Sequence, residues 1–135
     1  MTTLYVDCEF NGFGGELISM GIAASDGQEW YQVRAIPAEA EPWVASNVIP
    51  VLDGSPVGDE AFRRRLHNWL SQYKKPHVVA DWYTDLVHFF DCFRGENHAQ
   101  TFAFPCTAEI RFCKYVSAVP HNALEDAKAI RAVLS

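Results

Sequence analysis

Two acidic residues interrupt an apolar stretch near the start of the chain, in the sequence YVDCEF at residues 5–10. Side chains of a strand alternate between its two faces, so Asp7 and Glu9 point the same way, about 7 Å apart along the strand. Two unpaired carboxylates in this arrangement repel each other, and a cation between them removes the repulsion. The pair therefore predicts a site for a hard cation such as Mg²⁺ or Mn²⁺, which needs further acids from elsewhere in the chain.

Two acids in the second half of the chain border apolar helical faces. Asp85 precedes Phe89 by one helical turn and Asp126 precedes Ile130 by one turn, so both carboxylates lie beside residues expected to pack inward. An inward-facing acid needs a partner, which a shared cation would supply. An acid in the first turn of a helix also stabilises the helix dipole without any ligand, so each residue taken alone has a structural explanation.

A histidine stands five residues before the second of these acids. Asn122 and Glu125 have the spacing of a capping box, which predicts a helix that begins at Ala123. His121 then lies in the loop before this helix, from where its side chain can reach the same site as Asp126. Because imidazole titrates near neutrality, a histidine in such a site is suited to accept a proton from water.

The strands that must carry the first acid pair are predicted at the start of the chain. Alternation over residues 4–10 separates an apolar face from the face that holds the two acids. Further strands are expected at 16–25 and 28–35, joined by Asp-Gly as a two-residue turn. Together, the three strands would form an antiparallel meander.

Helices and strands are mixed in the remainder, after a proline-rich connection at 36–59. Apolar periodicity predicts, in chain order, a short helix at 43–48, a helix at 59–73 with Asp59 as N-cap, a strand at 77–81, a helix at 84–93, a strand at 101–105 and the terminal helix. This order indicates an α/β fold. We expect a single layered domain over 1–135, with a mixed sheet flanked by helices.

The composition fits one domain and restricts its partners. A chain of 135 residues that is 49% hydrophobic can bury one core. The formal net charge of -6 excludes the diffuse basic surface of a general nucleic-acid-binding protein, so a polyanion would be bound by local features. The four cysteines form no CxxC pair, and neither a signal-peptide pattern nor a membrane-length apolar run occurs. We expect a cytoplasmic protein without a membrane partner.

Taken together, these residues resemble two motifs of the DEDDh 3′-to-5′ exonucleases, a family with a ribonuclease H-like fold. The first motif, Asp-x-Glu on the first strand, is similar to VDCEF with Asp7 and Glu9. The third motif, a histidine followed five residues later by an aspartate, is similar to HNALED with His121 and Asp126. In addition, ELISMGIAASDGQEWYQV is similar to the second and third strands of compact exoribonucleases related to ribonuclease T and oligoribonuclease.

The second motif of the family is matched with one departure. It places an aspartate at the start of a helix, in many members four residues after an asparagine. The stretch ADWYTDLVHF offers Asp85 at the aspartate position and Asp81 where the asparagine would stand. We favour Asp85 because of its helix-start setting, and the alternative that Asp81 is the ligand stays open.

The resemblance implies hydrolysis with two divalent ions per site, Mg²⁺ or Mn²⁺. The implied metal ligands are Asp7, Glu9, Asp85 and Asp126. His121 would be the general base, and single-stranded RNA ends or 3′ overhangs would be cut to nucleoside 5′-monophosphates. Terminal bases could stack on the aromatic residues beside the motifs, Phe10, Phe13 and Trp82, although Phe10 also suits core packing.

Other interpretations agree with the same residues. The motifs bind phosphates and metals rather than the sugar, so DNA is a rival substrate, and an inactive chain that kept the fold would be a nucleic-acid-binding module. The basic residues Arg63, Arg64, Arg65, Lys74 and Lys75 could contact phosphates, but a solvated helix face explains them without RNA. Compact members of this branch are often homodimers, so a homodimer is also an expectation.

Overall fold

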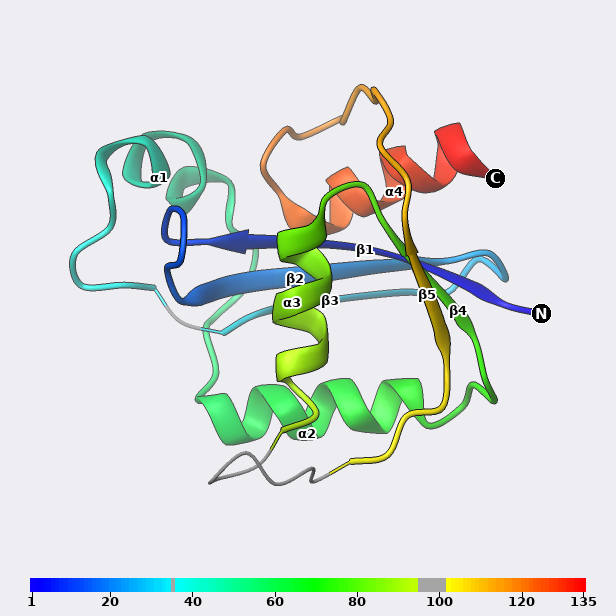
Figure 1. The fold of residues 1–135 in the computed structure, drawn as a ribbon. Helices are drawn as coiled ribbons and strands as arrows, with labels where there is room; N and C mark the ends of the chain where they lie inside the picture. Colours follow the sequence, from blue (N-terminus) through cyan, green and yellow to red (C-terminus); the bar gives the residue numbers. More distant parts are fainter. Residues whose placement is uncertain (35, 95–101) are drawn as a thin grey trace.

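Five strands form one mixed sheet in the computed structural model, which describes residues 1–34, 36–94 and 102–135. The strands are β1 (Thr3–Phe10), β2 (Leu17–Ala24), β3 (Glu29–Val33), β4 (His77–Ala80) and β5 (Thr107–Ile110). Their order across the sheet is β3-β2-β1-β4-β5. The first three strands are antiparallel neighbours, whereas β4 runs parallel to β1 and β5 parallel to β4 (Figure 1). The predicted meander and the mixed sheet of an α/β fold are confirmed.

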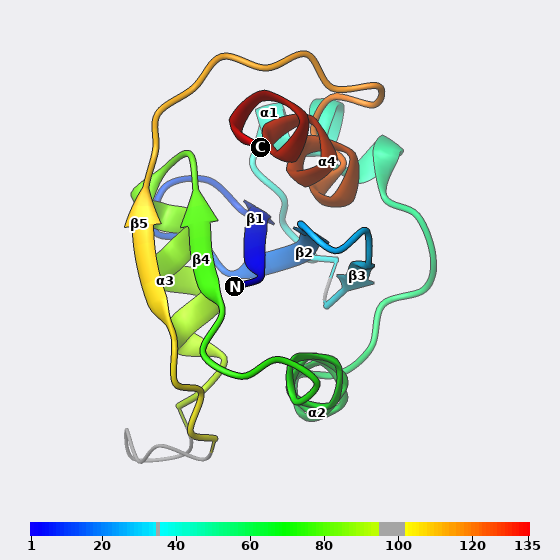
Figure 2. The ribbon, with the colours of Figure 1, turned by 90° about the vertical axis from the view of Figure 1, so that its right-hand side faces the viewer.

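Four α-helices flank this sheet within the described ranges: α1 (Pro42–Asn47), α2 (Asp59–Leu70), α3 (Tyr83–Asp91) and α4 (Ala123–Leu134). A short 3₁₀ helix, η1, spans Ile49–Val51. On one face of the sheet, Leu4 and Val6 pack with Phe89 of α3 and with buried residues of α2. On the other face, Tyr5 packs with Ile130 of α4, and Figure 2 shows α4 and α2 on opposite sides of β1 and β2. The predicted alternation along β1 is therefore confirmed.

The turn between β2 and β3 contains three residues rather than the predicted two. Ala24 and Gln28 close it, because the Ala24 N–H donates to the Gln28 carbonyl at 2.8 Å. Gly27, with φ of 94°, takes the left-handed conformation that ends such a loop at little steric cost. Asp-Gly correctly marks the turn, but Ser25 belongs to it as well.

Two further predictions are corrected. Asp59 is the first residue of α2 and not its N-cap, which is Gly58. The predicted strand at 101–105 is wrong for residues 102–105, where no strand forms; Thr101 and Ala35, at the ends of two predicted strands, lie outside the described residues. The aromatic side chains of Phe102 and Phe104 pack against the core instead, and the strand next to β4 forms later, at Thr107–Ile110.

The helices of the described chain are short. None combines the length and the apolar character that a membrane crossing would need.

Candidate functional site

The predicted acid pair lies where β1 extends beyond its parallel neighbour. β4 pairs with β1 only along Thr3 to Tyr5, and the chain leaves the sheet after Ala80. The carboxyl ends of parallel strands border the crevice in which open α/β sheets usually bind ligands. Asp7 is buried in this crevice and Glu9 is partly buried, both on the face that α4 covers.

A glycine on β2 lets α4 approach this face closely. Gly21 lies opposite Asp7 in the pairing of β1 with β2. A Cβ atom at Gly21 would collide with the backbone of Ala123 and Leu124, the first two residues of α4. The missing side chain therefore allows the start of α4 to rest directly on the sheet beside the acid pair.

The cap of α4 fixes the acid that this helix contributes. The Asn122 side chain accepts a hydrogen bond from the Glu125 N–H at 3.1 Å, which confirms the predicted helix start. In a full capping box, the Glu125 carboxylate would in turn accept a hydrogen bond from the Asn122 backbone N–H. Here it accepts one from Lys128 Nζ instead, at 3.1 Å. Asn122 Nδ2 also donates to the Val51 carbonyl, so the cap is tied to the connection that contains α1. Asp126, one turn into the helix, is buried.

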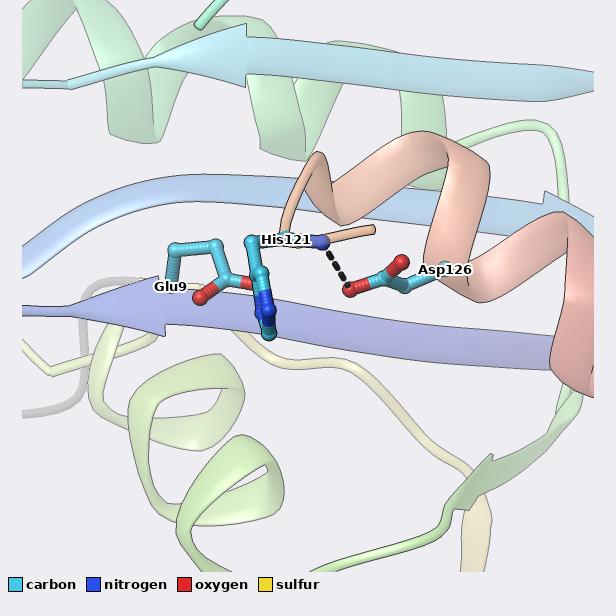
Figure 3. A group of neighbouring side chains, drawn as sticks. All are labelled: Glu9, His121 and Asp126. Atoms are coloured by element: carbon cyan, nitrogen blue, oxygen red, sulfur yellow. Dashed lines mark hydrogen bonds between the residues drawn. The ribbon is translucent and has the colours of Figure 1, made fainter. Parts of the chain in front are cut away.

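His121 lies in the loop before α4, as predicted, in an unusual backbone conformation. Its φ is 72°, in the left-handed region that non-glycine residues rarely adopt and that recurs at active sites. The His121 N–H donates to Asp126 Oδ2 at 3.2 Å, and Figure 3 shows the imidazole next to the Glu9 carboxylate. The ring of Trp43 meets the imidazole edge-on at a centroid distance of 4.9 Å. These contacts orient the histidine toward the acids.

Both aspartates that compete for the second motif reach the site. Asp81 follows β4 directly, and Asp85 is buried in the first turn of α3. Asp85 Oδ1 accepts a hydrogen bond from the Cys8 N–H at 3.0 Å, on the stretch of β1 that has no β4 partner. Asp85 therefore holds α3 against β1.

The acids and the histidine form two groups with metal-ligand spacing. The first group is Glu9, His121 and Asp126, and the second is Asp7, Asp81 and Asp85. Within each group, the potential ligand atoms all lie within 4.8 Å of one another. All six residues line one cavity of about 360 Å³. The three aromatic residues predicted to contact substrate, Phe10, Phe13 and Trp82, line the same cavity. Every site residue predicted from the sequence is thus brought to one place.

The electrostatics of this cavity disfavour ionised carboxylates. No lysine or arginine is among the described residues that line it. Burial, and then repulsion by Asp126 and Asp85, raises the pKa of Glu9 to about 9. Burial also raises the pKa of Asp85 to about 7, even though the hydrogen bond from Cys8 opposes the change. For Asp7, burial and the charges of Asp85 and Glu9 raise the pKa well above its ordinary value.

The donor set of the cavity fits hard divalent cations. Asp7 Oδ2 and Asp126 Oδ1 are buried and accept no hydrogen bond from the described residues. A buried carboxylate oxygen without a partner is costly, and a cation on that oxygen removes the cost. The available ligands are carboxylate oxygens and one imidazole, which suit Mg²⁺ or Mn²⁺.

The three predicted aromatic residues differ in how freely they could meet a ligand. Phe10 is partly buried and stacks on the His88 ring at a centroid distance of 4.9 Å, so much of it belongs to the core. Phe13, on the loop between β1 and β2, is 90% exposed. Trp82, just before α3, is 47% exposed and packs against Phe112.

Two aromatic residues of the cavity wall were not predicted as site residues. Tyr115 lies in the connection before α4, and burial followed by the charges of Asp7 and Asp126 raises its pKa. Trp43 comes from α1, and its ring contacts the ring of His121. Neither residue stands near a motif, and no periodicity or spacing in the sequence marks them.

No protein-family model matched the chain in a scan, and no curated protein matched it in a search.

Proposed function

We propose that the protein is a metal-dependent 3′-to-5′ exoribonuclease that releases nucleoside 5′-monophosphates from single-stranded 3′ ends. One observation carries the proposal: acids from β1, from the start of α3 and from α4 meet a histidine in one cavity that lacks a lysine or arginine among the described residues. Such a cavity repels a phosphate unless cations are bound. The mixed sheet flanked by helices also supports a ribonuclease H-like fold.

The divalent ions would be held by Asp7, Glu9, Asp85 and Asp126, with Asp81 close to Asp7 and Asp85. Two bound ions supply activation of the attacking water and charge stabilisation of the departing 3′ oxygen in an in-line displacement. Asp7 has a central place because the charges of Asp85 and Glu9 both act on its carboxylate, and the Cys8 N–H fixes one oxygen of Asp85. The hydrogen bond from the Cys8 N–H therefore helps to orient Asp85 in the site.

His121 acts as the general base. It removes a proton from the water whose oxygen forms the new bond to phosphorus. The bond between phosphorus and the 3′ oxygen breaks, and the shortened chain leaves with a 3′ hydroxyl. The Asp126 carboxylate accepts a hydrogen bond from the backbone N–H of His121, and Trp43 contacts the imidazole ring, so the backbone and the ring of the histidine are each held by a contact.

The cavity has the size of a small-ligand pocket, which supports hydrolysis at an end of the RNA strand. Its volume of about 360 Å³ lies at the lower end of the range of pockets that enclose a small molecule. Such a pocket has room for one terminal nucleotide. Phe13 and Trp82, both on its rim, are available to stack on the terminal base.

The test uses 5′-labelled single-stranded RNA with Mg²⁺ or Mn²⁺. Stepwise shortening from the 3′ end with release of nucleoside 5′-monophosphates is expected, and Asp7→Asn should abolish it. Asp26→Asn is the matched control, because Asp26 is exposed in the turn between β2 and β3, at the far end of the sheet. A matched DNA strand separates RNA from DNA preference. Absence of hydrolysis of either strand with both metals would contradict the proposal.

A further inference from the structure

Three aromatic side chains form an exposed surface beside the cavity, which we call the aromatic shelf: Trp82, Tyr83 and Phe112. Trp82 contacts Tyr83 at a centroid distance of 4.9 Å and Phe112 at 5.5 Å. Phe112 is 71% exposed and Tyr83 is 46% exposed. Large aromatic residues gathered in solvent mark binding surfaces more often than single exposed ones do.

The shelf continues the cavity outward. Trp82 lines the cavity together with Asp81 and Asp85, and it also makes both ring contacts within the shelf. Phe112 belongs to the segment after β5, which is held beside the end of β4 because the Arg111 N–H donates to the Ala80 carbonyl at 2.8 Å. Figures 1 and 2 agree that this segment runs past the connection from β4 to α3. A ligand that leaves the cavity over Trp82 therefore meets the shelf.

Two cations accompany the shelf. Arg111 and Lys114 flank Phe112, and both are exposed. Neither takes part in an ion pair with any described residue. By contrast, five of the other arginines, at positions 34, 63, 64, 94 and 131, have carboxylate partners. Free cations interleaved with aromatic rings are the pattern that single-stranded nucleic acids bind.

We propose that the aromatic shelf binds the nucleotides directly upstream of the 3′-terminal one in a single-stranded RNA, with bases on the rings and phosphates on Arg111 and Lys114. This inference rests on the proposed function, because the terminal phosphodiester must lie in the acidic cavity for the strand to leave over Trp82. Arg111 and Lys114 place positive charge beside the acidic cavity, in a chain with a formal net charge of -6.

The test measures the binding of a 5′-fluorescein-labelled heptanucleotide of RNA by fluorescence anisotropy, with Ca²⁺ in place of Mg²⁺ and Mn²⁺. Ca²⁺ also takes carboxylate oxygens as ligands, so the acids hold a cation while the proposed catalytic ions are absent. Phe112→Ala should weaken binding about tenfold, within the usual range for a lost stacking contact. Arg111→Ala should weaken binding and lower the slope of log K against log salt by about 0.7, the value for one phosphate contact on a single strand. Arg64→Ala is the matched control, because Arg64 is an exposed arginine on α2.

Unchanged heptanucleotide affinity in both Phe112→Ala and Arg111→Ala would overturn the inference. A shift from dimer to monomer in Phe112→Ala with unchanged RNA affinity would also overturn it, and would assign the shelf to a second copy of the chain. Failure of the proposed function gives a different result: the unaltered protein would bind the heptanucleotide through the shelf but would not hydrolyse it with Mg²⁺ or Mn²⁺.

Discussion

Two cavities of similar size are lined by acidic residues but, within the described chain, only one of them also contains arginines that neutralise these acids. The second cavity, of about 390 Å³, is lined by Glu16, Asp59 and Asp91 together with Arg34 and Arg63. Asp59 accepts hydrogen bonds from Arg34 Nε at 2.8 Å and from Arg63 Nε at 2.9 Å. The site cavity, of about 360 Å³, offers its acids no such cation among the described residues.

The pKa directions express this difference. At Asp59, burial acts to raise the pKa, but the hydrogen bonds from Arg34 and Arg63 outweigh it and lower the pKa below its ordinary value. At Asp85 and Glu9 no guanidinium opposes burial, and the pKa rises to about 7 and about 9. We interpret the acids that Arg34 and Arg63 neutralise as structural, and we propose that the acids without a protein cation bind cations from solution.

The largest effect should follow from removing one acid of the site. Glu9→Gln should lower the rate of metal-dependent RNA hydrolysis roughly a thousandfold or more, because ion binding supplies several kcal/mol of transition-state stabilisation. Single-turnover cleavage of labelled RNA measures this. Glu60→Gln, at a fully solvated position on α2, is the matched control, and an equal loss of activity in both variants would contradict the comparison.

Removing the proposed base should have the next largest effect. His121→Ala should lower kcat about a hundredfold, the usual contribution of a general base, and should flatten the acidic side of the pH-rate profile. The affinity for Mn²⁺, measured by calorimetry, should fall much less than in Glu9→Gln. An unchanged pH-rate profile would show that this residue does not transfer the proton.

The contact between α4 and the sheet can be broken without touching an acid. Gly21→Ala should destabilise the fold by about 1–3 kcal/mol, because the new Cβ displaces the backbone of Ala123 and Leu124 and with it Asp126. The urea concentration at the midpoint of unfolding and the rate of RNA hydrolysis should both fall. Gly58→Ser is the control, since a Cβ at Gly58 meets open space and serine is a favourable N-cap residue for α2. Wild-type activity in Gly21→Ala would refute this dependence on α4.

The acids of the two cavities should make the stability of the fold depend on pH in opposite directions. The pKa values of Glu9 and Asp85 are raised by folding, so their contribution to stability is fully present below about pH 4 and is lost as the pH rises through about 7 and about 9. In EDTA, the melting temperature should therefore fall between about pH 5 and about pH 9. Mn²⁺ should reverse the fall. Asp59, whose pKa is lowered, loses its contribution only on acidification. A melting temperature in EDTA that rises across this interval would contradict the assignment.

The smallest effect is expected in the second cavity. Asp59→Asn removes the ion pairs of Asp59 with Arg34 and Arg63. Because the Asp59 side chain is 48% exposed, the substitution should lower the free energy of unfolding by less than about 1 kcal/mol. Hydrolysis of RNA should stay at the wild-type rate. A loss comparable to that of Glu9→Gln would remove the distinction between structural and functional acids.

Local rules explain why much of the site could be predicted from the sequence. Strand alternation alone places Asp7 and Glu9 on one face, and the cap at Asn122 alone places His121 outside α4. The choice between Asp81 and Asp85 could not be made in this way. Both lie near the end of β4, and only the packing of α3 against β1 shows that both reach the cavity.

Other features depend on contacts between distant segments. Asp59 begins a helix, as its neighbourhood indicates, but its partner Arg34 lies in another segment and could not be inferred. The strand β5 was missed because its four side chains are all exposed and give no apolar signal, whereas the aromatic stretch before it does. Tyr115 reaches the cavity through the course of a connection without periodicity.

The most direct test is anomalous diffraction from crystals grown with Mn²⁺. We predict two manganese peaks in the cavity between Asp7, Glu9, Asp85 and Asp126. A site cavity without manganese would contradict the proposed metal site, above all if manganese were bound beside Asp59 in the second cavity.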